Sequence, residues 1–216
     1  MTILIEACVD SLESALAAAK GGAHRLELCA NLTVGGTTPP PDLIAEVRAG
    51  TPLPIMAMIR PRGGSYVHSR AELAQMRTDI DMATVAGADG VVLGVLDGGN
   101  RVDVERTREL VLAAGNRPVV FHRAFDLVPD LERGLESLVA AGISRVLTSG
   151  GAPNALAGAE MLATLVRLGG DRIAVMAGGK VRGPNVRELV AKTGVREVHA
   201  RCKLDESQIR AIAAAL

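Results

Sequence analysis

The chain has 216 residues, of which 48% are hydrophobic and 1% aromatic, with 24 basic and 24 acidic side chains. A length of this order fits one large domain or two small ones. The zero formal net charge gives no general attraction to nucleic acid or to an anionic membrane, and the scarcity of aromatic side chains argues against base stacking. No apolar run approaches the roughly 18 residues of a membrane span. We therefore expect neither a nucleic-acid partner nor a membrane partner.

The first ten residues, MTILIEACVD, carry two acidic side chains and no basic region, so they do not have the pattern of a signal peptide. Three cysteines are too few for a disulfide framework in a chain of this length. Both observations predict a cytoplasmic protein. If the chain assembles, a symmetric homodimer is the form to expect, because most soluble oligomers are symmetric homo-oligomers.

One unit recurs along the chain: a helical run ends in glycine, and a short apolar run follows. VAGADGVVLG and VAAGISRVLT are two examples. A glycine after a helix is typical of a left-handed C-terminal cap, and near-continuous apolar runs are typical of strands buried on both faces. The pattern predicts eight strands, at residues 3–8, 24–29, 54–60, 90–94, 118–122, 144–148, 172–177 and 195–199.

Eight strand–helix units with no linker between them indicate a (β/α)8 TIM barrel, with residues 1–216 as a single domain. Ser69 and Glu72 have the spacing of a capping box, which supports a helix start at that point. A doubly wound open sheet is the alternative. No G-x-G-x-x-G follows the first predicted strand, however, where a dinucleotide site of that fold would need it.

Ionisable side chains interrupt the predicted strands. Barrel enzymes hold their functional groups at the C-terminal ends of the strands, and a charge costs less there because water or a ligand reaches it. We therefore expect most of these side chains to line the mouth of the barrel. They are Glu6, Arg25, Glu27, Arg60, His122, Glu197 and His199.

Two features of the predicted loops indicate an anion site at the same mouth. In the segment IRPRGG, we expect Arg60 to point toward Glu6 and Glu27 and Arg62 to reach over the rim. Glycine pairs follow the sixth and seventh predicted strands and stand before helices, where backbone N–H groups bind anions. The predicted anion-binding residues are Arg62, Arg123, Ser149, Gly150, Gly151, Gly178 and Gly179.

Five stretches in order, LTVGGTTPP, IRPRGGSY, FHRAFD, LTSGG and MAGG, resemble the CutC family. The resemblance covers almost the whole chain, from ACVDSLESALAAAKGGAHRLELCANL near the start to VREVHA near the end. It implies a (β/α)8 barrel, a cytoplasmic location and a link to copper homeostasis. It brings no agreed reaction with it.

The first functional hypothesis is Cu(I) binding by Cys8 and Cys29. Each cysteine lies two residues past a glutamate, on strands that should be neighbours about 4.8 Å apart. Cu(I) is soft and prefers thiolate ligands, and the resemblance also assigns the family's copper binding to these two positions. The alternative is that both are ordinary buried cysteines, which behave as small hydrophobic residues. Cys202 is poorly placed to join them.

The second hypothesis is an enzyme that acts on a small phosphorylated or carboxylated metabolite. Arginine forks bind carboxylate and phosphate groups, and a histidine can transfer protons near neutral pH with a glutamate as partner base. The alternative is that the charges form a salt-bridge network that only holds the barrel together. The candidate catalytic residues are Glu6, Arg25, Glu27, Arg60, His122 and Asp126.

Overall fold

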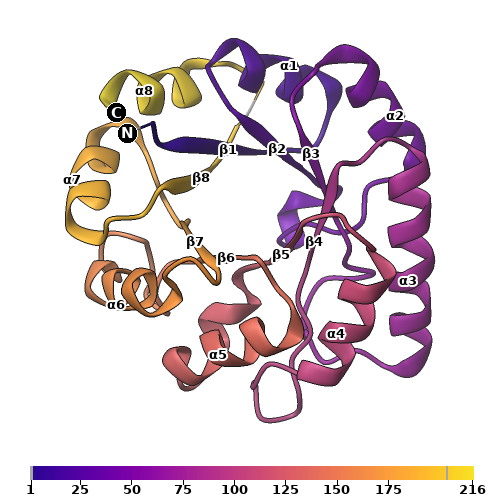
Figure 1. Ribbon diagram of the computed structural model, residues 1–216. Coiled ribbons are helices and arrows are strands. Elements are labelled where there is room, and N and C mark those ends of the chain that lie inside the picture. Colours follow the sequence, from indigo (N-terminus) through magenta and orange to yellow (C-terminus); the bar gives the residue numbers. More distant parts are fainter. Residues whose placement is uncertain (1, 203) are drawn as a thin grey trace.

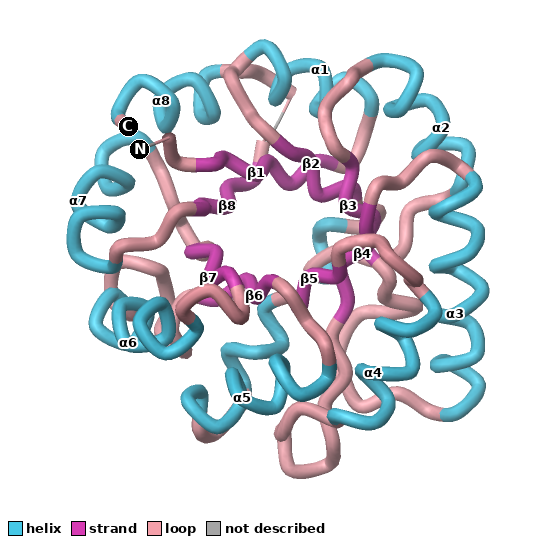
Figure 2. Tube along the Cα trace, viewed as in Figure 1, coloured by secondary structure: helices cyan, strands magenta, loops and turns pink. Residues whose placement is uncertain are grey.

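The computed structural model describes residues 2–202 and 204–216, which form a closed barrel of parallel strands in the order β1 to β8. Helices surround the ring of strands on its outer side (Figures 1 and 2). The predicted TIM barrel is therefore confirmed. The strands are β1 (Leu4–Val9), β2 (Arg25–Leu28), β3 (Ile55–Met58), β4 (Gly90–Leu93), β5 (Val119–Phe121), β6 (Arg145–Thr148), β7 (Ala174–Ala177) and β8 (Glu197–Arg201).

Helices follow the strands in alternation, as the repeating unit predicts. Every predicted strand is present, with ends that differ from the prediction by at most two residues. The α-helices are α1 (Leu12–Lys20), α2 (Pro41–Gly50), α3 (Arg70–Val85), α4 (Val104–Ala113), α5 (Leu131–Ala141), α6 (Ala159–Gly169), α7 (Gly183–Thr193) and α8 (Ser207–Ala215). Two short 3-10 helices, η1 (Leu32–Val34) and η2 (Arg123–Leu127), lie in the loops after β2 and β5.

The predicted capping box at the start of α3 is also confirmed. The Ser69 hydroxyl accepts a hydrogen bond from the Glu72 backbone N–H at 3.2 Å, and the Glu72 carboxylate accepts one from the Ser69 N–H at 2.7 Å. These bonds satisfy two backbone donors that a helix start would otherwise leave without partners.

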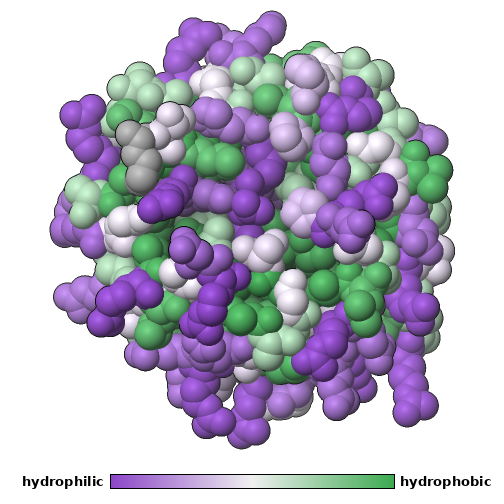
Figure 3. All heavy atoms as spheres, in the orientation of Figure 1, coloured by the Kyte–Doolittle hydropathy of each residue, from purple (hydrophilic) through white to green (hydrophobic). Residues whose placement is uncertain are grey.

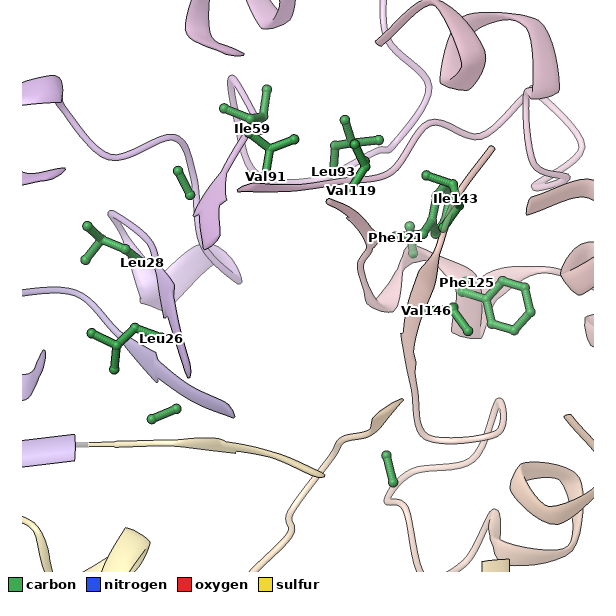
Figure 4. Packing of buried hydrophobic residues seen from close by; sticks show 14 of the residues in the cluster. Leu26, Leu28, Ile59, Val91, Leu93, Val119, Phe121, Phe125, Ile143 and Val146 are labelled. Atoms are coloured by element: carbon green, nitrogen blue, oxygen red, sulfur yellow. The ribbon is translucent and has the colours of Figure 1, made fainter. Parts of the chain in front are cut away.

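The larger hydrophobic core lies between the strands and the helices. Leu26 and Leu28 of β2 belong to the same buried cluster as Ile44 and Val47 of α2. Phe121 of β5 belongs to it as well, and Figure 4 shows such side chains projecting from the outer side of the strands. This layer holds the helices against the barrel.

A second, smaller cluster fills the inside of the barrel. Side chains alternate in direction along a strand, so the residues between those of the outer core point inward. The barrel is therefore packed, and the surface seen along its axis is closed by side chains, with hydrophilic groups prominent around the perimeter (Figure 3). The inner cluster consists of Cys8, Cys29, Met56, Met58, Val92, Val120, Leu147 and Met176.

No helix in the described part of the chain is long and apolar enough to cross a membrane.

Gly90, the first residue of β4, leaves space that Met56 occupies. A Cβ atom at this position would lie 2.5 Å from the Met56 Cε atom and 2.5 Å from the Pro118 carbonyl oxygen. We expect Gly90→Ala to lower the free energy of unfolding by about 1–3 kcal/mol through overpacking. Chemical denaturation measures this loss.

The matched control is Gly98→Ala, because a Cβ atom at Gly98 would have no neighbour within 4 Å. Its effect should stay within about 0.5 kcal/mol. Equal stability of the two variants would contradict the packing of Met56 against Gly90.

Candidate functional site

A network of ion pairs lies at the N-terminal end of the barrel. Arg25, the first residue of β2, donates a hydrogen bond from Nη2 to Glu197 Oε2 at 2.8 Å. Arg145, the first residue of β6, donates from Nε and Nη2 to the two oxygens of the same carboxylate at 2.6 and 2.8 Å. The expectation that Arg25 and Glu197 line the C-terminal mouth is therefore wrong. Their charges are satisfied by pairing inside the barrel and not by solvent.

The carboxylate of Glu6 connects this network to the next layer of the barrel. The side chain is fully buried, and the strand register places Arg25 and His199 on its two sides. Arg25 Nε lies 2.5 Å from Glu6 Oε2, and His199 Nδ1 lies 2.9 Å from Oε1. Burial alone would raise the pKa of Glu6, but the hydrogen bond with His199 and the charge of Arg25 lower it to about 2. Glu6 is therefore ionised inside the barrel.

Above this layer, two thiols and a carboxylate come together from neighbouring strands. Cys8 of β1 stands opposite Glu27 of β2 in the register, and Cys29 directly follows β2. The ligand atoms of these three residues all lie within 4.8 Å of one another. Glu27 Oε2 is 3.7 Å from Cys29 Sγ and 3.7 Å from His199 Nε2, so this carboxylate lies between the thiols and the imidazole.

Burial controls the protonation of this group. The hydrogen bond with Cys29 and burial raise the pKa of Cys8 well above its ordinary value. The hydrogen bond with Cys8 lowers the pKa of Cys29, but burial and the Glu27 charge outweigh it and raise the value to about 11. Burial lowers the pKa of His199, but the charge of Glu27 and the contacts with Cys8 and Glu6 raise it well above the ordinary value. Both cysteines are thiols at neutral pH.

The donor atoms fit a soft metal ion. Two thiolates on opposite sides of an ion, each at a typical metal–sulfur distance of about 2.3 Å, span about 4.6 Å. The Cys8 and Cys29 sulfurs lie within 4.8 Å of each other, which is within reach of one shared ion. A second group of potential ligands, Glu6, Glu27 and His199, shares Glu27 with the first.

The guanidinium of Arg60 binds the backbone of two loops. Its Nη1 atom donates to the carbonyls of Val34 and Gly36, and its Nη2 atom donates to the carbonyl of Gly64, each at 3.0 Å. The guanidinium also stands over the ring of Tyr66, 4.7 Å from the centroid. The Arg60 side chain is 3% exposed, so backbone carbonyls stabilise a buried guanidinium. Arg60 thus joins the loop after β2 to the loop after β3.

The predicted direction of Arg60 toward Glu6 and Glu27 is therefore wrong. Strand β3 ends at Met58, so strand alternation no longer fixes the side-chain direction at residue 60. Arg62 does lie at the surface, but it pairs with the Glu72 carboxylate, with an Nε–Oε1 distance of 2.5 Å. Both arginines hold loops in place.

His122 is buried at the end of β5 and packs 4.9 Å from the ring of Tyr66. Its Nδ1 atom accepts a hydrogen bond from the Ala124 backbone N–H at 3.2 Å. Burial and the nearby charge of Arg60 lower the pKa of His122 to about 3. The ring is therefore neutral near pH 7, so the geometry gives no support to proton transfer by His122 in that range.

Asp126 occupies the loop predicted to bind an external anion. Its carboxylate accepts hydrogen bonds from the Thr148 hydroxyl at 2.5 Å and from the backbone N–H groups of Ser149 and Gly151 at 2.9 and 3.1 Å. It also accepts from the Ser149 hydroxyl at 3.1 Å and pairs with Arg123 Nε at 2.7 Å. The Asp126 carboxylate thus occupies the hydrogen-bond donors of Ser149, Gly151 and Arg123, which the sequence predicts to bind an external anion.

The two glycine pairs do not form a helix N-terminus. Residues 152–158 separate Gly150 and Gly151 from α6, and the Gly150 N–H donates to the Thr148 hydroxyl. The Gly178 N–H donates to the Thr148 carbonyl, which keeps the β6 and β7 ends in register. Gly179 stands beside Arg123. The expected anion cradle of free N–H groups is therefore wrong for Gly150, Gly151 and Gly178.

Comparison with known proteins agrees with the sequence resemblance. The family model for the CutC family matches residues 3–204. The chain belongs to the CutC family. A CutC family protein of Chromobacterium violaceum is 45% identical over 94% of this chain and 82% of its own length, and one of Xanthomonas campestris pv. campestris is 47% identical over 92% and 83%. The crystal structure of a CutC protein from Streptococcus agalactiae is 35% identical, with a TM-score of 0.88 over 94% of this chain and all of its own.

Three residues organise the interior of this CutC family member but are not among the catalytic, anion-binding or metal residues predicted from the sequence. They are Arg145, Glu197 and His199. Glu197 and His199 stood among the charged strand positions, and their alternation along the strand beside β1 was a usable signal. Arg145 carried no comparable signal, because an arginine at the start of a predicted strand is commonly a solvated loop residue.

The buried pairs of Arg25 make this side chain a strong determinant of stability. We expect Arg25→Met to lower the free energy of unfolding by about 3–5 kcal/mol, because Glu6 and Glu197 lose a buried partner. The control is Arg172→Met, since Arg172 pairs with Glu136 on the surface, where solvent screens the pair, and its loss should change the stability much less. Denaturant unfolding compares them, and equal losses would contradict the role of Arg25.

The low pKa of His122 predicts a loss of stability in acid. The folded ring resists protonation down to about pH 3, whereas the unfolded ring takes a proton near pH 6.5, so protonation favours the unfolded chain as the pH falls between these values. Nitrogen NMR of histidine-labelled protein should show the His122 ring neutral at pH 5. A midpoint above pH 6 would contradict the burial of this ring beside Arg60.

Proposed function

We propose that this chain binds one Cu(I) ion between Cys8 and Cys29, inside the barrel, and that it does so in the cytoplasm. The observation that carries the proposal is the approach of two buried thiols within 4.8 Å. Thiolate is the ligand that soft Cu(I) prefers. Cys8 and Cys29 are free thiols, which suits a reducing compartment.

The surroundings of the two sulfurs favour a soft, poorly hydrated ion. Cys8 and Cys29 belong to the inner cluster, whose other members are methionine, valine and leucine side chains. Apolar side chains around a metal limit the access of water and lower the local dielectric constant. A hard, strongly hydrated cation such as Mg²⁺ prefers oxygen ligands and retains several water molecules, so it suits this volume poorly.

Binding must displace protons, because both cysteines are thiols at neutral pH. The Cys8 and Cys29 sulfurs each release a proton when they coordinate the ion. Support for copper as the ion comes also from the family, since the Streptococcus agalactiae relative is named as a copper homeostasis protein.

The metabolite-enzyme hypothesis receives no comparable support. The guanidinium of Arg60 binds backbone carbonyls, and the N–H groups of Ser149 and Gly151 bind Asp126. These hydrogen bonds use the groups on which that hypothesis depends.

Anaerobic titration with Cu(I) against a coloured chelator tests the proposal. The wild-type chain should bind one ion tightly, and Cys8→Ser and Cys29→Ser should each weaken binding by about 100-fold or more. Cys202→Ser is the matched control, because Cys202 belongs to the outer core and should leave the affinity unchanged. Wild-type affinity in both the Cys8 and the Cys29 variant would overturn the proposal.

A further inference from the structure

We propose that His199 is a third binding group for the Cu(I) ion through its Nε2 atom, and that Glu6 is the positioning residue that fixes its ring. This inference rests on the proposed function and specifies the coordination at the same site. It gives the buried ion-pair network a function, which a site made of the two cysteines alone does not.

The first argument is the position of His199 Nε2. This atom lies 3.7 Å from Glu27 Oε2, and Cys29 Sγ lies 3.7 Å from the same oxygen. The Cys8 thiol interacts with the side chains of both Cys29 and His199. Glu27 thus belongs both to the group with the two thiols and to the group with His199, and the contact of Cys8 with His199 links the two groups.

The second argument is the orientation of the ring. The Glu6 carboxylate pairs with the Arg25 guanidinium, and a carboxylate in an ion pair accepts hydrogen bonds, so the 2.9 Å contact with Glu6 Oε1 places a proton on His199 Nδ1. That bond leaves Nε2 as the nitrogen that faces the thiols. A carboxylate that holds one imidazole nitrogen while the other faces a metal is the usual arrangement around metal-binding histidines.

The third argument is the rigidity of Glu6. Its second oxygen accepts from Arg25 at 2.5 Å, Arg25 also pairs with Glu197, and Arg145 binds both oxygens of Glu197. The network is buried from Glu6 to Glu197 and partly buried at Arg145, and each member fixes the next. His199 is thereby held from the opposite end of the barrel.

The chemistry of the donors selects nitrogen over oxygen for the third position. Imidazole is a good ligand for copper, whereas the Glu27 carboxylate is a hard donor that suits other ions. Among the described residues, His199 is the histidine that occurs in a group able to hold a metal, with Glu6 and Glu27, and this group shares Glu27 with the cysteine group. Binding displaces the Nε2 proton of the His199 imidazolium, which leaves to solvent together with the two thiol protons, and no oxidation or reduction takes place.

Two spectroscopic measurements on the full chain, loaded with Cu(I) alone, test this coordination. Cu(I) has a filled d shell, so nitrogen NMR of histidine-labelled protein remains readable, and of the four histidines only His199 should show a large Nε2 shift. X-ray absorption should find two sulfur neighbours and one nitrogen neighbour. Two sulfurs alone, with an unshifted His199, would overturn this inference and leave the cysteine site standing.

Variants separate binding from a purely structural role. His199→Gln should lower the Cu(I) affinity about 10–100-fold and remove the nitrogen neighbour while one ion still binds. Glu6→Gln should lower the affinity less and retain the nitrogen. His24→Gln is the control, because His24 lies outside both candidate ligand groups and its Nδ1 atom accepts from the Ile5 N–H.

A His199→Gln chain that melts at a lower temperature but keeps the wild-type affinity would show a structural role only and overturn the inference. If His199→Gln or Glu6→Gln fails to fold, the spectra of the wild-type chain still decide. If the wild-type chain binds no Cu(I) at all, the proposed function itself is wrong, which is a different result from sulfur-only coordination.

Discussion

The buried charge of Glu6 is the constraint on which the interior of this barrel depends. A carboxylate without any solvent contact is stable only when cations and donors surround it. The register of the closed sheet supplies them, because β2 and β8 flank β1 and place Arg25 and His199 level with Glu6. The ion-pair network and the orientation of His199 both follow from this one requirement.

The loops at the mouth obey the same rule with different partners. Arg60 is a buried cation held by backbone carbonyls, and Asp126 is a carboxylate held by backbone N–H groups and Arg123. Each of these side chains binds groups in a loop that follows a different strand from its own. The rim is thereby fixed by charges that are already paired, whereas the two thiols inside the barrel have only weak partners and are available for a ligand.

The sequence is informative where local rules decide the outcome and uninformative where they do not. Glycine caps and buried apolar runs predict the barrel, and strand order alone makes Cys8 and Cys29 neighbours. Arg60 shows the limit, because its direction depends on where β3 ends, and a difference of two residues removes the alternation rule. The hydrogen bond from the Ser149 N–H to Asp126 joins residues 23 positions apart, so no local sequence pattern predicts it.

The inner cluster has a further consequence, because it makes the barrel interior unsymmetrical. Thiol, carboxylate and imidazole groups come from β1, β2 and β8, whereas β3 to β7 present mainly methionine, valine and leucine. A bound ion would therefore lie off the barrel axis, with its ligands on one side and the apolar side chains of β3 to β7 on the other. Substitutions among these apolar side chains, at Val92 or Val120 for example, would change the polarity around the ion and leave every donor atom in place.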